Sequence, residues 1–164
     1  MIRKAILNDA RQIHQLLLTY ARDGIVLSRS LMEIFESIRD FYVFVDADRV
    51  VGAAALNICW QDLAEIRSLV VEQSHAGRGI GRHLVEACLA EARQLGIGRV
   101  FALTYQQTFF EKLGFVVIEK AELPQKIWGD CIKCAKFPEC DEIALSLSLE
   151  TESPDGCSGK VPEP

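Results

Sequence analysis

The sequence has no apolar run that approaches the roughly twenty residues needed to span a bilayer. Its first twelve residues, MIRKAILNDARQ, also lack the apolar core of a secretory signal peptide. Basic residues never run together, since the eighteen Lys and Arg are scattered and the net charge is −5. No internal repeat is visible. These absences argue against a membrane protein and a nucleic-acid-binding protein, and they favour a cytoplasmic location.

The chain is also too short for two comfortable domains. With 164 residues and 49% apolar residues, it can bury one sizeable core, which we expect within residues 1–150. The last segment, residues 151–164, is rich in Pro, Gly and Ser and is expected to be a disordered tail. Six cysteines do not imply a disulfide scaffold, because Cys59 and Cys88 fall within a predicted strand and a predicted helix.

Three of the other cysteines have a spacing that invites comparison with a metal site. Cys131, Cys134 and Cys140 form the pattern C-x-x-C-x5-C. A structural zinc site needs four ligands, and only Asp141 or Cys157 is available as a fourth. Reduced thiols in a loop and a metal site are therefore both open, and we favour the thiols.

A glycine-rich turn connects a predicted strand to a predicted helix in the middle of the chain. Residues 65–71 are rich in β-branched and apolar side chains, as a strand buried in a covered sheet should be. From Ile80 onward, apolar residues recur in steps of three and four, which predicts an amphipathic helix that ends before Gly96. Between strand and helix, every second position is a glycine: Gly77, Gly79 and Gly81.

This turn predicts a phosphate-binding site. Unpaired N–H groups and the positive end of the helix dipole meet there, and Arg78 and Arg82 add positive charge. A nucleoside-triphosphate loop would need the spacing G-x-x-x-x-G-K-[ST], which is absent. The dinucleotide fingerprint G-x-G-x-x-G fits poorly too, because the three glycines follow G-x-G-x-G. The ligand should therefore carry phosphate but belong to another class.

The remaining sequence predicts alternating strands and helices. Apolar patterns and turn residues indicate strands at 2–7, 41–46, 50–59, 99–103, 114–118 and 143–149. Helices are expected after the N-cap signal Asn8-Asp9, after Ser28 or Ser30, and over residues 108–113. This order predicts a mixed α/β fold.

Residues 76–81 resemble motif A of the GNAT acyl-coenzyme A N-acetyltransferases, Q/R-x-x-G-x-G/A, with Ala76 in place of Gln or Arg. The preceding strand and the segment FFEKLGF (109–115) are similar to the family in order and spacing. The resemblance implies the GNAT fold, an α/β (α+β) arrangement whose mixed, mostly antiparallel sheet is flanked by helices. It also implies acetyl-CoA as co-substrate, with no metal in the chemistry. The implied coenzyme contacts are Leu69, Val70, Val71, Gly77, Arg78, Gly79, Ile80, Gly81 and Arg82.

Further stretches are similar to the acetyltransferase domain of N-acetylglutamate synthases: residues 27–30, 51–56, 60–67 and 100–104. The similarity runs from about Ile2 to Leu149, in a short form with no room for the amino-acid-kinase-like domain of some relatives. We therefore expect no regulation through such a domain. The implied reaction is acetyl transfer from acetyl-CoA to the α-amine of L-glutamate, the first step of arginine biosynthesis.

The resemblance also implies catalytic roles. Glu65, at the start of the central strand, is the candidate general base, and the alternative is a solvated carboxylate at a strand edge. Many GNAT enzymes have a tyrosine as general acid where this chain has Phe110, which cannot donate a proton. Tyr105 is the candidate substitute, and the alternative is a packed amphipathic side chain.

Glutamate has two carboxylates, so its site should contain at least two cations, preferably arginines. Arg29 matches the Arg-Ser pair of the family before the second helix. Arg67 shares a strand face with Glu65 unless a bulge intervenes. Surface ion pairs are the alternative for both arginines, and Lys126 and Lys133 are weaker candidates.

Two rival functions stay open. Another GNAT enzyme could acetylate a polyamine, an antibiotic or a protein terminus, and a cationic acceptor of this kind would need an acidic cleft. A non-catalytic acyl-CoA sensor is conceivable because of Phe110 and Ala76. The sequence does not decide whether the chain forms a homo-oligomer.

Overall fold

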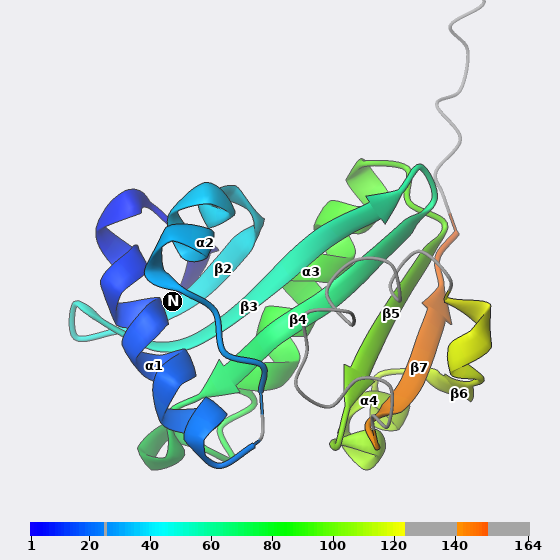
Figure 1. Cartoon of the computed structure of the whole chain (residues 1–164). Helices are drawn as coiled ribbons and strands as arrows, with labels where there is room; N and C mark the ends of the chain where they lie inside the picture. Colours follow the sequence, from blue (N-terminus) through cyan, green and yellow to red (C-terminus); the bar gives the residue numbers. More distant parts are fainter. Residues whose placement is uncertain (25, 124–140, 151–164) are drawn as a thin grey trace, which may run out of the picture.

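A twisted sheet of seven strands organises the protein, and helices cover both of its faces (Figure 1). The structure is a computed structural model, and it describes residues 1–24, 26–123 and 141–150. The strands lie in the order β1-β2-β3-β4-β5-β7-β6. All neighbours are antiparallel except β4 and β5, which are parallel. This is the mixed, mostly antiparallel sheet that the resemblance to GNAT enzymes implies.

The strands follow the predicted segments closely. They are β1 (Ile2–Lys4), β2 (Phe41–Asp46), β3 (Arg49–Trp60), β4 (Leu63–Val71), β5 (Arg99–Thr104), β6 (Val116–Ile118) and β7 (Ile143–Ser148). The helices are α1 (Ala10–Arg22), α2 (Leu31–Glu36), α3 (Ile80–Gln94) and α4 (Gln107–Lys112). Short 3-10 helices lie at Leu7–Asp9, Ile38–Asp40, Gln73–His75 and Lys120–Glu122. None of the described helices is long and apolar enough to cross a membrane.

Helix ends are set by identifiable side chains. Of the two serines proposed for the start of α2, Ser30 is the N-cap: its Oγ accepts from the Glu33 amide at 3.1 Å, and Glu33 Oε2 accepts from the Ser30 amide at 2.8 Å. Strand β1 is shorter than predicted, since it ends at Lys4 and the prediction extended to residue 7. Asp9 accepts hydrogen bonds from the Ile6 amide at 2.8 Å and from Arg3 at 2.7 Å, which turns the chain toward α1 soon after Lys4.

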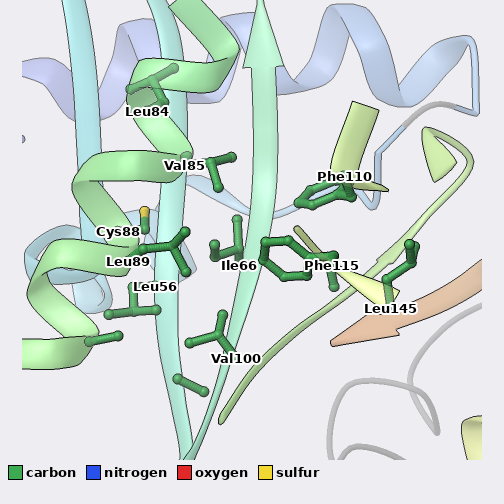
Figure 2. Packing of buried hydrophobic residues seen from close by; sticks show 14 of the residues in the cluster. Leu56, Ile66, Leu84, Val85, Cys88, Leu89, Val100, Phe110, Phe115 and Leu145 are labelled. Atoms are coloured by element: carbon green, nitrogen blue, oxygen red, sulfur yellow. The ribbon is translucent and has the colours of Figure 1, made fainter. Parts of the chain in front are cut away.

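Two apolar cores lie on opposite faces of the sheet. Figure 2 shows Leu84, Val85 and Leu89 of α3 facing Leu56 and Ile66 of the sheet. The other core packs α1 against the opposite face. Alternate residues of β3 serve the two cores: Ala54 and Leu56 join the first, and Ala53 and Ala55 join the second. This double burial explains why β3 is apolar at consecutive positions.

The start of α3 approaches β3 very closely. A Cβ atom on Gly52 would lie 3.1 Å from Ile80 Cγ2 and 3.2 Å from Leu84 Cδ1. A glycine at position 52 therefore lets the first turn of α3, and with it the glycine-rich turn, lie directly on the sheet.

Several predictions concern residues that lie outside the described ranges. They are the tail 151–164, the cysteine group Cys131, Cys134 and Cys140, and the reserve cations Lys126 and Lys133. Among the described residues, no group of three or more His, Cys, Asp or Glu side chains could hold a metal ion.

Candidate active site

Strands β4 and β5 part in the middle of the sheet. They are paired from Leu63–Arg99 to Glu65–Phe101, and the described residues contain no β4–β5 pair beyond that point. Strand β5 instead continues beside β7 along its full length, from Arg99–Ser148 to Thr104–Ile143. The second half of β4 therefore has a strand neighbour on the β3 side and an open edge on the side where β5 diverges (Figure 1).

Glu65 lies at the point of separation. Its side chain is buried, and only 3% of the residue is exposed. This burial differs from the solvated edge carboxylate that the sequence left open. A buried carboxylate at the mouth of a gap between strands is suitably placed to accept a proton from a bound amine.

A bulge in β4 follows directly after the candidate substrate residue Arg67. Residues 65 to 67 pair regularly with Asn57 to Ala55, but Ala53 then pairs with Val70, so two steps along β3 match three along β4. Ser68 adopts a left-handed φ of 55° at this bulge. Because the irregularity comes after Arg67, Glu65 and Arg67 do point to the same face of the sheet, as predicted.

Backbone donors line the open edge of β4. The Glu72 amide donates to the Val51 carbonyl on the β3 side at 2.8 Å. Successive residues of a strand direct their amides to opposite sides, so the Val71 amide, and two residues earlier the Leu69 amide, point to the open edge. The Val70 amide points toward β3. Of the three strand residues expected to contact the coenzyme, Leu69 and Val71 thus direct an N–H group to the open edge, and Val70 does not.

The glycine-rich turn has the predicted form. Gly77 and Gly79 have φ angles of 78° and 77°, which L side chains rarely adopt, and Gly79 is the N-cap of α3. A Cβ on Gly77 would meet nothing within 4 Å, and one on Gly79 only His83 Cε1 at 3.9 Å. The turn therefore exposes bare backbone and the first amides of a 15-residue helix. Arg78 is exposed, whereas Arg82 Nε is bound to Glu86 Oε1 at 2.8 Å.

These features fit the coenzyme that the motif predicts. Acetyl-CoA carries a pyrophosphate, which suits amides at a helix N-terminus. It also carries a narrow amide-containing arm, which suits the backbone donors at the open edge of β4. The turn and the open edge meet because β4 ends at Val71, shortly before Gly77. A Cβ on Gly81 would lie 3.7 Å from Val71 Cγ2 and 3.5 Å from the Phe109 ring.

The candidate substrate cations differ in their surroundings. Arg67 is half-buried on the face that carries Glu65, and it acts electrostatically on Asp40, a residue that sequence reasoning missed. Burial raises the pKa of the Asp40 carboxyl, while the charges of Arg67 and Lys4 act to lower it. Arg29 belongs to the segment that connects α1 to α2, and it is half-buried, with its Nε inside the protein. The helices α1 and α2 cover one face of the sheet (Figure 1), and Arg67 lies on that face because it pairs with Ala55, which packs beneath these helices.

The candidate acid, Tyr105, lies just beyond the end of β5. Its hydroxyl donates to Asp141 Oδ1 at 2.5 Å, and 39% of the residue is exposed. Phe110, at the position where many GNAT enzymes have tyrosine, is buried and lies next to Phe115 (Figure 2). Its ring centroid is 5.1 Å from that of Phe109 and 5.1 Å from that of Phe115. Phe110 therefore belongs to the core.

Comparison with known proteins gives the chain a family. The sequence profile of the Acetyltransferase (GNAT) family matches residues 10–115. An uncharacterized N-acetyltransferase of Chlorobaculum tepidum is 44% identical over 90% of this chain and 96% of its own length. An amino-acid acetyltransferase of Mycobacterium tuberculosis is 36% identical over 89% of this chain and 85% of its own length.

A solved structure shows what one relative binds. N-acetylglutamate synthase from Neisseria gonorrhoeae, complexed with coenzyme A and N-acetyl-glutamate, matches with a TM-score of 0.82 and 28% identity. The match covers 92% of this chain and 35% of that one. The family profile, the amino-acid acetyltransferase relative and the shared fold agree with one another: the chain belongs to the GNAT acetyltransferase family and is an acetyl-CoA-dependent N-acetyltransferase.

Proposed function

We propose that this enzyme transfers the acetyl group of acetyl-CoA to the α-amine of L-glutamate, the first step of arginine biosynthesis. One observation carries the proposal. Buried Glu65 and half-buried Arg67 share one face of β4 at the point where the sheet opens, so a base and an anion-binding cation flank one gap. The relatives named as amino-acid acetyltransferase and N-acetylglutamate synthase support glutamate as the acceptor.

Acetyl-CoA supplies an acetyl group activated as a thioester. Glu65 accepts a proton from the ammonium group of glutamate, directly or through a water molecule, so that the nitrogen lone pair becomes available. One backbone amide at the open edge, that of Leu69 or of Val71, stabilises the negative charge that develops on the carbonyl oxygen, since amides two residues apart on a strand cannot both reach one oxygen. The nitrogen forms the new C–N bond and releases its second proton to solvent, the C–S bond breaks, and the sulfur keeps the electron pair. Tyr105 is our candidate to protonate it, which requires its hydroxyl to leave Asp141.

The acceptor is held by its carboxylates in this proposal. Arg67 and Arg29 each offer a planar pair of donors for one carboxylate. A cationic acceptor such as a polyamine would meet these two guanidinium groups and be repelled. The same two residues therefore favour an acidic amino acid over the rival classes of amine.

A turnover screen tests the assignment. The enzyme is incubated with acetyl-CoA and each amino acid, and free thiol is measured. Glutamate should be acetylated far faster than glutamine, which keeps the α-carboxylate but lacks the second charge, and faster than aspartate, which is one methylene shorter. Equal rates with glutamate and glutamine would contradict the proposal. Binding of acetyl-CoA without turnover on any amine would favour the acyl-CoA sensor. A cytoplasmic location stays a prediction.

A further inference from the structure

A hydrogen-bonded cluster ties the turn between β2 and β3 to the segment that leads into the glycine-rich turn. Arg49 Nη1 and Nη2 donate to the two oxygens of Glu72 at 2.6 and 2.8 Å. His75 Nε2 lies 3.0 Å from Asp46 Oδ2. Asp46 and Arg49 are the last pair of the β2–β3 ladder, while Glu72 and His75 lie just before Ala76. We call these four residues, with Ser74, the clamp.

The β2–β3 turn presents its two clamp residues together. Ala47 and Asp48 have φ angles of 47° and 60°, which is the left-handed backbone of a tight hairpin. Asp46 and Arg49 are directly paired across it, so their side chains stand next to each other on one face of the ribbon. The Asp46 carboxylate and the Arg49 guanidinium thus extend from the β2–β3 hairpin to the segment that leads into the glycine-rich turn.

His75 is the centre of the clamp. Its Nδ1 lies 2.9 Å from Ser74 Oγ and 3.1 Å from Glu72 Oε2, and only 12% of its side chain is exposed. A carboxylate only accepts hydrogen bonds, so the contact with Asp46 is a hydrogen bond when Nε2 is the donor. The Ser74 hydroxyl also donates to Glu72 Oε2 at 3.0 Å. Because it is bound to Glu72 as well as to His75, it is not arranged as a serine nucleophile that a histidine base activates. The cluster is therefore suited to hold the backbone in place.

The clamp matters because the glycine-rich turn begins directly after it. Position 76 carries Gln or Arg in motif A, but Ala76 has no polar side chain for a phosphate. Beside the charge of Arg78, affinity for the phosphates should therefore come from backbone amides, whose positions depend on two left-handed glycines. Glycine loses more conformational freedom on ordering than any other residue. With His75 held at one end and α3 beginning at Ile80, only residues 76–79 lie between two fixed points.

We propose that His75 is a positioning residue for coenzyme binding. Held by Asp46 and Glu72, it fixes the backbone at Ala76 so that the amides of the glycine-rich turn are arranged for the pyrophosphate before the coenzyme arrives. His75 itself does not contact the coenzyme. The inference rests on the proposed placement of the coenzyme at residues 76–81 and is independent of the acceptor amine.

The test compares His75→Ala, His75→Gln, Asp46→Ala and the double variant His75→Ala/Asp46→Ala. Calorimetry gives the dissociation constant of CoA, and steady-state kinetics give kcat and both KM values. If the fraction of His75→Ala molecules whose glycine-rich turn is in the binding-competent form falls to about one fifth, CoA should bind to this variant about fivefold more weakly. The kcat at saturating acetyl-CoA should not change. His75→Gln should recover most of the affinity, since its amide can still donate to Asp46.

The double variant should bind CoA no more weakly than the weaker single variant, because both changes break one contact. Lys4→Gln is the matched control. It removes the Lys4–Glu91 ion pair, which is 3.1 Å long and lies near the far end of α3, and it should leave CoA affinity unchanged. If His75→Ala does not fold, Asp46→Asn carries the test, since it removes only the charge that His75 faces.

Two results would overturn the inference. One is unchanged CoA affinity in His75→Ala, and the other is fold-changes that multiply in the double variant. The placement of the coenzyme is tested separately by Gly79→Asp. If Gly79→Asp loses CoA while His75→Ala does not, only the role of His75 is wrong. If neither variant affects CoA, the placement itself is wrong.

Discussion

Glu65 of β4 faces Phe101 of β5 in the last pair that these two parallel strands form. The candidate base thus occupies the last position at which the backbone is held by strands on both sides. Phe101 is fully buried and packs with Leu63 and Leu123, so the base rests on a rigid apolar support. A rigid base next to an open edge is what acetyl transfer to an amine requires.

Replacing Glu65 should slow the reaction without weakening coenzyme binding. Glu65→Gln keeps the size of the side chain but cannot accept a proton, so kcat should fall about 100-fold while CoA affinity stays near wild type. The deficit should shrink as the pH rises, because the acceptor amine then loses its proton without help. Stopped assays across a pH series measure this, with the exposed Glu119→Gln as the control. A deficit independent of pH would make Glu65 a positioning residue.

The glycine-rich turn can be tested with a pair of isosteric side chains. Asp and Asn both tolerate the φ of 77° at Gly79 better than most residues, and their Cβ would meet only His83 at 3.9 Å. Gly79→Asp adds a negative charge where the pyrophosphate is expected and should abolish measurable CoA binding. Gly79→Asn should weaken binding only a few-fold. Equal CoA affinities of the two variants, measured by calorimetry, would argue against a phosphate at this position.

The two arginines should affect one substrate only. Arg67→Ala and Arg29→Ala each remove a charge-assisted contact, so the KM for glutamate should rise about 10–100-fold. The KM for acetyl-CoA should change little. Arg67→Lys should lie in between, because an ammonium group cannot form the bidentate contact. Arg93→Ala, on the exposed side of α3, serves as the control. Equal increases in both KM values would indicate that the arginines are structural.

Folding stability should depend on pH through Asp9. Burial acts to raise the pKa of the Asp9 carboxyl, but hydrogen bonds from Arg3 and the Ile6 amide outweigh it and lower the pKa. A lowered pKa stabilises the folded state above the ordinary value of about 3.9, and this contribution is lost as the pH falls through the folded-state value. Asp9→Asn should cost about 1–3 kcal/mol near neutral pH.

Urea unfolding at about pH 7 and about pH 3 measures this effect. The stability difference between wild type and Asp9→Asn should be large at the higher pH and small at the lower one. If this difference is the same at both pH values, the shape of the Asp9 side chain, and not its charge, determines its contribution to stability.

Several features of the fold could be predicted from the sequence because the residues that determine them lie close together along the chain. The three- and four-residue repeat from Ile80 onward predicts α3 nearly to its last residue, Gln94. The pattern Ser30-x-x-Glu33 is a capping box, and the structure forms it. The turn glycines Gly77 and Gly79 have the positive φ angles that their place before a helix implies.

Other features depend on contacts between distant segments. Nothing around Ser68 in the sequence marks a bulge, since it arises from the mismatch between β3 and β4. His75 and Asp46 are 29 residues apart and meet only because of the hairpin register. The electrostatic effect of Arg67 on Asp40 likewise needs β2, β3 and β4 to be assembled first. These are properties of the folded sheet and have no local signal.

The open edge of β4 has a consequence for the exchange of its amide hydrogens with solvent. The Val70 and Glu72 amides are directed to β3, whereas the Leu69 and Val71 amides point to the side that β5 has left. Amides without a partner in the ladder lose their protons to deuterated water faster than their neighbours. Neighbouring residues of one strand should therefore exchange at alternating fast and slow rates in the free enzyme. With CoA bound, the fast positions should slow down, and the alternation along β4 should disappear.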